Sequence, residues 1–227
     1  MIGEPDQGFP DVFGRGSPAP AAPPTAPAAP GAPPQGGGAG GGGFGGGGQV
    51  GANSVFALAS DGTLHQLSVQ TGKDIVMQPL QVVPPNSNAS SLILVDGVLY
   101  VSTTNDCGGA PNGVWAVDLG SSNKTVTSWK TNGPNVAGTG GPTVGSDGTV
   151  YVATTEASGS ASTYANAVVA LEAKTLKVKD YFSRDKADFI ASSLVFQHKD
   201  KDLVVAVGKD GRVYILNSAS LGGSDHH

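Results

Sequence analysis

Four segments of this 227-residue chain repeat one pattern of apolar and polar residues. They are His65–Val69, Trp115–Leu119, Val169–Ala173 and Tyr214–Ser218. Aligned on Leu67, Val117, Leu171 and Leu216, they recur at intervals of 50, 54 and 45 residues. Each segment follows a short apolar run that has the alternation of a half-buried strand. A period of about 50 residues built from such strands is typical of the blades of a β-propeller.

The strand-like runs are joined by short turns, several of which contain Asp-Gly. These turns include Asp61-Gly62, Asp96-Gly97 and Asp147-Gly148. Asp-Gly supplies the positive φ angles that tight hairpins require. The runs predict four units over residues 54–80, 91–131, 141–184 and 192–218, which contain three, four, four and three strands. The predicted fold class is therefore all-β, with four-stranded antiparallel blades and about three and a half of them present.

A closed propeller has about four to eight blades, and closure protects the strand edges. The predicted half-blades indicate a fragment of a seven- or eight-bladed propeller, with the remaining blades supplied by missing sequence or by a second chain. On this interpretation residues 1–53 are an insertion between blades. The rival interpretation is a four-bladed ring in which the first and last units, with three strands each, meet at a weakened seam.

Pairs of very small residues precede the innermost strand of three predicted blades. The pairs are Ser90-Ser91, Gly140-Gly141 and Ser192-Ser193. Innermost strands crowd together around a propeller axis, so small side chains are expected where they approach one another.

Composition changes sharply at the start of the first predicted blade. Residues 1–53 are rich in Pro, Ala and Gly, which predicts a disordered linker. Residues 224–227 are expected to form a short tail after the blades of residues 54–223.

The net charge is −5 and the sequence has no block of like charges, which argues against nucleic acid as a partner. No apolar run reaches the roughly 18 residues of a membrane helix, and no signal peptide is recognisable in this chain.

The repeat resembles that of the pyrroloquinoline quinone (PQQ) propellers, the quinoprotein alcohol dehydrogenase-like and outer-membrane-assembly-like proteins. Their strand motif Asp-Gly-x-Val-Tyr-Val is matched at Asp147–Val152 and Asp96–Val101. Their following motif, Ala-x-Asp-x-x-Thr-Gly-Lys-x-x-Trp, is matched in part by Ala116 and Asp118 and by Thr71–Lys73. The resemblance covers residues 54–223. It implies a bacterial protein that works in the periplasm or outside the cell.

The sequence departs from this motif at the position of the tryptophan that docks one blade on the next. Val76 stands where the first unit would carry that tryptophan, and Trp129 comes 11 residues after Asp118 where the motif has 8. The difference predicts a longer turn before the last strand of the second unit.

The resemblance implies the site of PQQ dehydrogenases, in which a vicinal disulfide, a stacking tryptophan and a calcium ion hold the quinone beside a catalytic aspartate. Cys107 is the one cysteine of this chain, so a vicinal disulfide cannot form within it. The expected function is therefore a non-catalytic binding or scaffold module that binds a protein or a polysaccharide at a propeller face. The alternative is a fragment of a PQQ-dependent dehydrogenase that oxidises an alcohol or sugar, with PQQ and calcium as cofactors.

One loop carries the residue types that a ligand site would use. Asn105, Asp106 and Cys107 provide an amide, a carboxylate and a thiol beside two glycines, and we take them as weak candidates for cofactor binding. The competing interpretation is an Asx-type turn with a half-buried cysteine. Calcium requires about six or more oxygen ligands, which this loop does not offer. The four histidines do not cluster, so the sequence names no catalytic and no metal-binding residue.

Overall fold

The structure is a computed structural model that describes residues 53–158 and 162–226. Contacts along the backbone divide the chain into residues 1–44 and 45–227, and all the described residues belong to the second unit. The linker predicted for residues 1–53 lies, apart from Asn53, outside the described residues.

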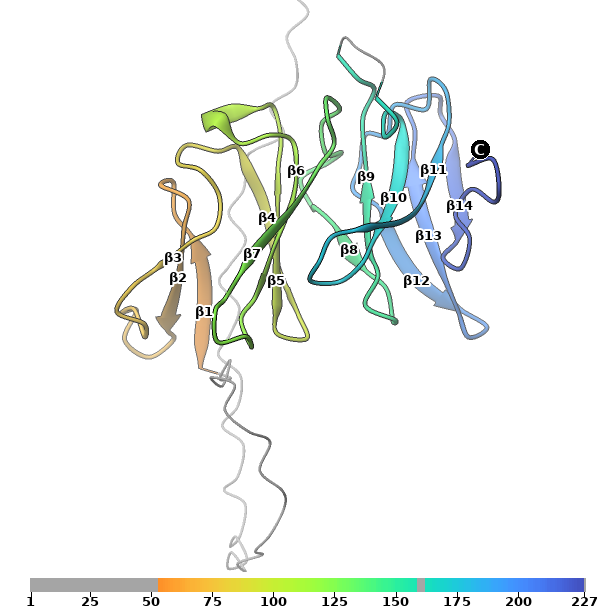
Figure 1. Cartoon of the computed structure of the whole chain (residues 1–227). Helices are drawn as coiled ribbons and strands as arrows, with labels where there is room; N and C mark the ends of the chain where they lie inside the picture. Colours follow the sequence, from red (N-terminus) through yellow and green to blue (C-terminus); the bar gives the residue numbers. More distant parts are fainter. Residues whose placement is uncertain (1–52, 159–161, 227) are drawn as a thin grey trace, which may run out of the picture. The chain divides into compact units, whose positions relative to one another are not determined.

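The described residues form four antiparallel sheets of three, four, four and three strands, which confirms the all-β fold class. We call these sheets blades one to four in chain order (Figure 1). Blade one contains β1 (Ser54–Leu58), β2 (Thr63–Ser68) and β3 (Leu80–Gln81), and blade two contains β4 (Ala89–Val95), β5 (Val98–Thr103), β6 (Gly113–Asp118) and β7 (Val126–Lys130). Blade three contains β8 (Thr143–Val144), β9 (Val150–Ala153), β10 (Ala167–Leu171) and β11 (Val178–Ser183), and blade four contains β12 (Leu194–His198), β13 (Lys201–Val207) and β14 (Val213–Asn217).

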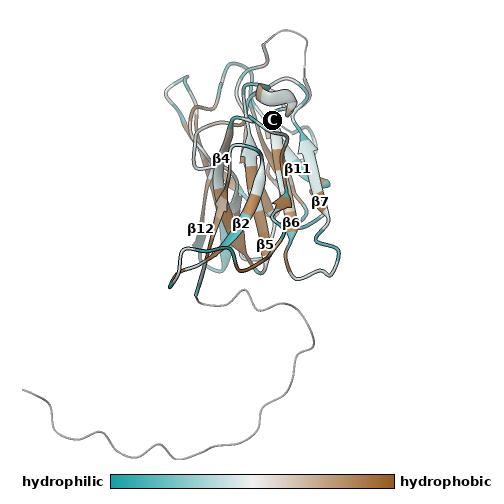
Figure 2. Ribbon diagram, turned by 90° about the vertical axis from the view of Figure 1, so that its left-hand side faces the viewer, coloured by the Kyte–Doolittle hydropathy of each residue, from teal (hydrophilic) through white to brown (hydrophobic). Residues whose placement is uncertain are grey.

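Turn chemistry explains the hairpins within the blades. Asp96 and Gly97 both have positive φ, 49° and 75°, in the two-residue connection that pairs Val95 with Val98. Positive φ at both central residues matches the right-handed twist of the flanking strands. Apolar residues concentrate along the strands, and polar residues concentrate in the turns (Figure 2).

The last strand of blade one is much shorter than the sequence predicts. The third run of the unit predicted over residues 54–80 spans residues 74–80, whereas β3 contains only Leu80 and Gln81. Pro79 has no amide hydrogen for a strand ladder, and Met77 is 99% exposed, although Val76 and Leu80 are half-buried.

Close approach of the innermost strands confirms the role of the small residues. A Cβ atom added to Gly141 would lie 1.8 Å from Oγ of Ser91, on blade two. A Cβ atom added to Gly138 would lie 2.3 Å from the backbone nitrogen of Ser192, which precedes β12. Larger side chains at these positions would force neighbouring blades apart.

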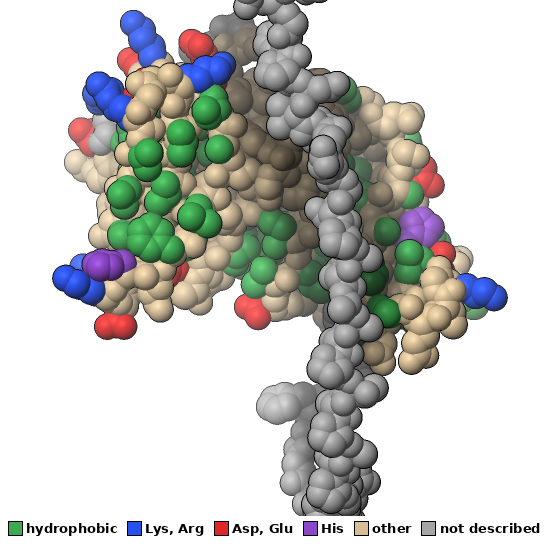
Figure 3. Space-filling model, turned by 180° about the vertical axis from the view of Figure 1, so that it is seen from behind, with side chains coloured by type: hydrophobic (Ala, Val, Ile, Leu, Met, Phe, Trp, Pro, Cys, Tyr) green, Lys and Arg blue, Asp and Glu red, His purple; other side chains and the backbone are tan. Residues whose placement is uncertain are grey.

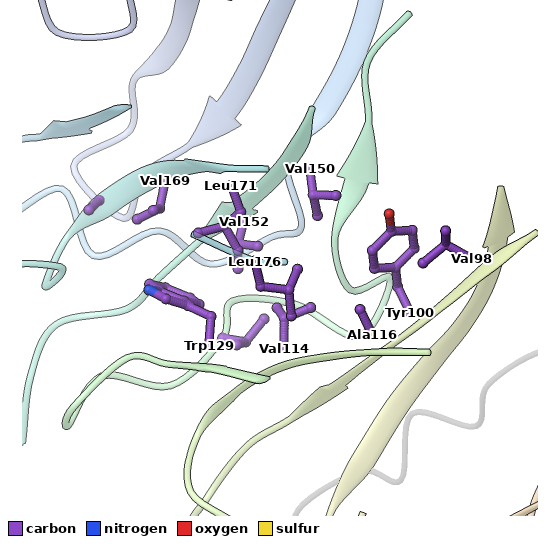
Figure 4. Packing of buried hydrophobic residues seen from close by; sticks show 12 residues of the cluster. Val98, Tyr100, Val114, Ala116, Trp129, Val150, Val152, Val169, Leu171 and Leu176 are labelled. Carbon is purple, nitrogen blue, oxygen red and sulfur yellow. The ribbon is translucent and has the colours of Figure 1, made fainter. Parts of the chain in front are cut away.

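The hydrophobic core consists of three clusters, each between two neighbouring blades. The central cluster joins the face of blade two that carries Tyr100 and Trp129 to the face of blade three that carries Val152 and Leu171 (Figure 4). Leu64 with Leu99 and Val101 belongs to the cluster between blades one and two. Tyr151 with Val204 and Leu216 belongs to the cluster between blades three and four. Each inner sheet is therefore buried on both faces.

Candidate functional site

The loop that contains Asn105, Asp106 and Cys107 connects β5 to β6 and has an unusual backbone. Asn105 and Asp106 have φ of 64° and 45°, a left-handed conformation that Asn and Asp adopt more readily than most residues. A short 3-10 turn over Cys107–Gly109 follows. The amide of Asn105 donates a 2.9 Å hydrogen bond to Oδ1 of Asn135, in the segment that leads to blade three. The loop therefore also contacts the next blade.

The polar side chains of this loop hold the loop itself. Oδ1 of Asp106 accepts a 3.1 Å hydrogen bond from the amide of Asn112, and Oδ1 of Asn112 accepts a 2.9 Å bond from the amide of Asp106. This reciprocal pair is an Asx-type arrangement that closes the loop. The cysteine differs from the expected half-buried residue because Cys107 is exposed. The structure thus places Asn105, Asp106 and Cys107 in one loop, where the carboxylate of Asp106 and the backbone amide of Asn105 are structural groups.

The two tryptophans are engaged in blade packing. Nε1 of Trp115 donates a 2.9 Å hydrogen bond to Oγ1 of Thr103 within blade two. Trp129 is buried between blades two and three, where its ring packs edge-on against the ring of Tyr164, with 5.5 Å between the ring centroids. No group of three or more metal-ligating side chains gathers among the described residues. The residues in the described part of the chain therefore do not fit the quinone and calcium set that the resemblance implies.

Blade one aligns a hydroxyl, an imidazole and a carboxylate. Nε2 of His65 lies 3.1 Å from Oγ1 of Thr63, and Nδ1 lies 3.0 Å from Oδ1 of Asp74. The hydroxyl of Thr63 also donates a 2.6 Å hydrogen bond to Oδ1 of Asp61. The hydroxyl of Thr63 has one proton, and it donates that proton to a hydrogen bond with Asp61. It therefore cannot donate the same proton to the imidazole of His65, and the arrangement lacks the activated nucleophile of a catalytic triad.

Charged side chains join neighbouring blades at their ends. Nζ of Lys209, in the turn before β14, pairs with Oδ2 of Asp188 at 2.5 Å, and Oδ1 of Asp188 accepts a 3.0 Å hydrogen bond from the amide of Glu156. The hydrogen bond from Lys209 holds the pKa of Asp188 below its usual value. Lys174 makes a similar 2.9 Å pair with Asp118 between blades three and two, and this contact lowers the pKa of Asp118.

A serine-rich cavity of about 470 Å³ lies between blades one and two. It is lined by the end of β1 and by the start of β4 with the residues before it: Leu58, Ala59, Ser60, Ser87, Ala89, Ser90, Ser91 and Leu92. The lining contains no titratable side chain, so the cavity offers hydroxyl and backbone hydrogen bonds but no general acid or base.

A group of exposed apolar side chains lies on the face of blade four that points away from blade three. Leu194, Phe196, Val213 and Ile215 are 58%, 40%, 61% and 62% exposed. The register places Val205 between Leu194 and Ile215, so the side chains form continuous rows across the sheet. Hydrophobic side chains gather over this sheet in the surface view (Figure 3). We call this surface the blade-four face.

Sequence reasoning did not identify the blade-four face, although one signal was present. Residues 203–207 are apolar without interruption, a pattern that predicts burial on both faces of a strand. Val204 and Ala206 are buried against blade three, whereas Leu203, Val205 and Val207 are only half-buried on the opposite side.

Comparison with known proteins identifies the fold. No family model and no curated protein matches the chain. Among solved structures, the crystal structure of a quinohemoprotein alcohol dehydrogenase from Comamonas testosteroni is similar to this chain, with 16% identity and a TM-score of 0.50. The similar region covers 74% of this chain and 32% of that one, so this chain spans about a third of that enzyme's length. This similarity confirms, at the level of the fold, the resemblance to PQQ-type β-propellers. No helix in the described ranges is long and apolar enough to cross a membrane.

Proposed function

We propose that this chain is a non-catalytic binding module made of PQQ-type propeller blades, and that it holds another protein on the blade-four face. The observation that carries the proposal is the exposure of Leu194, Phe196, Val213 and Ile215 on one face of one sheet. Contiguous apolar surface of this kind marks interaction sites on soluble proteins.

Comparison with the other blades supports this proposal. The corresponding faces of blades two and three carry Tyr100 and Tyr151, and both are buried against the next blade. The blade-four face has the same apolar character along β13, which the half-buried Leu203 and Val205 provide. Burial of such side chains contributes about 25 cal/mol per Å² of apolar surface, which favours a sheet or another flat apolar surface as the occupant.

The chemistry of the blade-four face favours a protein over a polysaccharide. Leu194, Val205 and Ile215 have no hydrogen-bonding groups in their side chains. Sugar hydroxyls buried against them would lose hydrogen bonds to water without replacement, which costs about 1–3 kcal/mol for each group. Periplasmic or extracellular location remains part of this proposal and rests on the resemblance to PQQ propellers.

Site-specific photo-crosslinking in the native cell tests the proposal. A photoreactive residue at position 215 is expected to capture a defined protein, whereas the same residue at position 77 on blade one is not. The captured protein is then identified, purified and titrated by calorimetry. Association with a negative heat-capacity change is expected because apolar surface is buried.

Two variants distinguish the blade-four face from other surfaces. The double variant Leu194→Glu/Ile215→Glu is expected to weaken binding at least tenfold, and Met77→Glu, an apolar-to-acidic change at a more exposed residue of blade one, is expected to leave it unchanged. Equal affinity of both variants would overturn the proposal. Saturable, calcium-dependent binding of PQQ with oxidation of an alcohol would support the dehydrogenase alternative instead.

A further inference from the structure

One edge of blade one has no partner strand in the described part of the chain. The order of its sheet is β1-β2-β3, so β1 is an edge strand. In the repeat, Leu67 on β2 corresponds to Val117, Leu171 and Leu216, which lie on the third strands of their blades: β6, β10 and β14. Therefore β1 is a second strand, and residues 53–158 and 162–226 contain no innermost strand for blade one of the kind that β4, β8 and β12 provide in the other blades.

The spacing of the repeat aligns β1 with β13, because Gly62 lies five residues before Leu67 and Gly211 lies five residues before Leu216. The amide of Ala59 donates to the carbonyl of Thr63, and the amide of Gly62 donates to the carbonyl of Ala59, both at 2.9 Å. The same two bonds occur in blade four, from Gly208 to Arg212 and from Gly211 to Gly208. By this correspondence Phe56 and Leu58 take the places of Val205 and Val207.

The backbone of β1 presents hydrogen-bonding groups at this edge. Asn53 and Ala59 form backbone hydrogen bonds to the β2 side, and these bonds alternate along an antiparallel strand. Phe56 and Leu58 therefore direct their amide and carbonyl groups away from β2. At the corresponding place in blade four, the carbonyl of Val207 accepts a 3.1 Å hydrogen bond from the amide of Ile190, in the segment before β12.

The serine-rich cavity lies where the absent strand would run. Its lining joins the end of β1, from Leu58 to Ser60, to the part of β4 around Ser90 and Ser91. Between blades two and three, the residue that faces Ser91 is Gly141. A Cβ atom added to Gly141 would lie 1.8 Å from Oγ of Ser91, so the innermost strands of neighbouring blades approach closely at this level. An occupant of the cavity therefore needs an extended backbone and very small side chains where it approaches Ser90.

We propose that the β1 edge is an acceptor for an extended segment of a partner polypeptide, which adds as the innermost strand of blade one. The segment runs antiparallel to β1, as β12 does to β13, and bonds to the backbone of Phe56 and Leu58. Backbone bonds to the edge provide affinity, and the serine-lined cavity selects small residues. This site is separate from the blade-four face and does not depend on the function proposed for that face.

A peptide with the sequence of residues 190–198, the chain's own blade-four inner strand, is the probe. Labelled peptide is titrated into the full chain by fluorescence anisotropy, and amide hydrogen exchange is followed by NMR. Saturable binding is expected, with slowed exchange at Phe56 and Leu58. The same peptide with an N-methylated leucine at the position of Leu194 loses one backbone donor and is expected to bind at least tenfold more weakly.

Matched tryptophan variants test the cavity. Ser60→Trp places a large side chain in the lining and is expected to weaken peptide binding at least tenfold. Ser122→Trp, in the exposed turn before β7, is expected to leave binding unchanged. The proposal is overturned if the peptide does not bind, if it protects Val213 and Ile215 in place of the β1 amides, or if Phe56 and Leu58 are already protected in the chain alone.

Discussion

Oδ2 of Asp202, on β13, accepts a 2.6 Å hydrogen bond from the backbone amide of Ser146, in the turn between β8 and β9. This bond joins blade four to blade three at a position where the Asp202 side chain is almost fully buried. A buried acceptor from one blade thus satisfies a backbone donor from the next, as burial of polar groups requires.

Removal of this acceptor is expected to destabilise the chain. Asp202→Ala leaves the amide of Ser146 without a partner, and we expect a loss of about 1–3 kcal/mol in the free energy of unfolding. Asp202→Asn keeps a side-chain oxygen and is expected to lose less. Urea unfolding followed by circular dichroism measures both variants, and equal losses would contradict this account of the bond.

Gly141 is expected to be intolerant of any side chain. Gly141→Ala combines a positive φ of 70° with a clash against Ser91, so we expect a loss of at least about 2 kcal/mol. Gly109→Ala is the matched control, because Gly109 has a φ of 75° but no atom within 4 Å of the added Cβ. Similar losses for both variants would mean that backbone conformation, and not blade contact, decides the cost.

High pH is expected to weaken the packing between blades. Burial raises the pKa of Tyr100 and of Tyr151, which are 2% and 1% exposed. Because the folded pKa values lie above the unfolded value of about 10, this contribution to stability is present below pH 10 and is lost as the pH rises further. The free energy of unfolding is expected to fall above pH 10.

The double variant Tyr100→Phe/Tyr151→Phe isolates the contribution of these two tyrosines to this fall. Tyr214, through burial, and Lys174 and Lys209, through hydrogen bonds to Asp118 and Asp188, also have raised pKa values and add a change of the same sign in every variant. The double variant is therefore expected to lose stability less steeply above pH 10. An unchanged slope would show that the tyrosines ionise without unfolding the chain.

The thiol of Cys107 is expected to react in the folded chain. Cys107 is exposed, so a water-soluble thiol reagent is expected to modify one equivalent without denaturant. A thiol that reacts only after unfolding would contradict the exposed position of the cysteine.

Asp106→Ala removes the acceptor for the amide of Asn112, and is expected to loosen the loop and to lower the free energy of unfolding by about 1 kcal/mol.

The repeat at Leu67, Val117, Leu171 and Leu216 predicted the strand content of the described chain, because alternation and turn residues act locally. The same local signals failed at residues 74–80, where Ile75, Val76 and Met77 are consecutive apolar residues but only Val76 is half-buried. At the candidate loop, the sequence identified Asn105, Asp106 and Cys107 as chemically capable. The fold was needed to show that Asn135 bonds the backbone amide of Asn105, that Asn112 bonds the carboxylate of Asp106, and that the cysteine is exposed.

Local patterns in the sequence were enough to show that this chain forms blades of a β-propeller, since strand periodicity and Asp-Gly turns depend on neighbouring residues alone. The packing of the blades sets which faces and edges remain uncovered. Val204 and Val205 are adjacent and chemically identical, yet one is buried against blade three and the other lies on the blade-four face. The reason is physical: the free energy of burial depends on which surface lies opposite a side chain, and that surface comes from residues far away in the sequence.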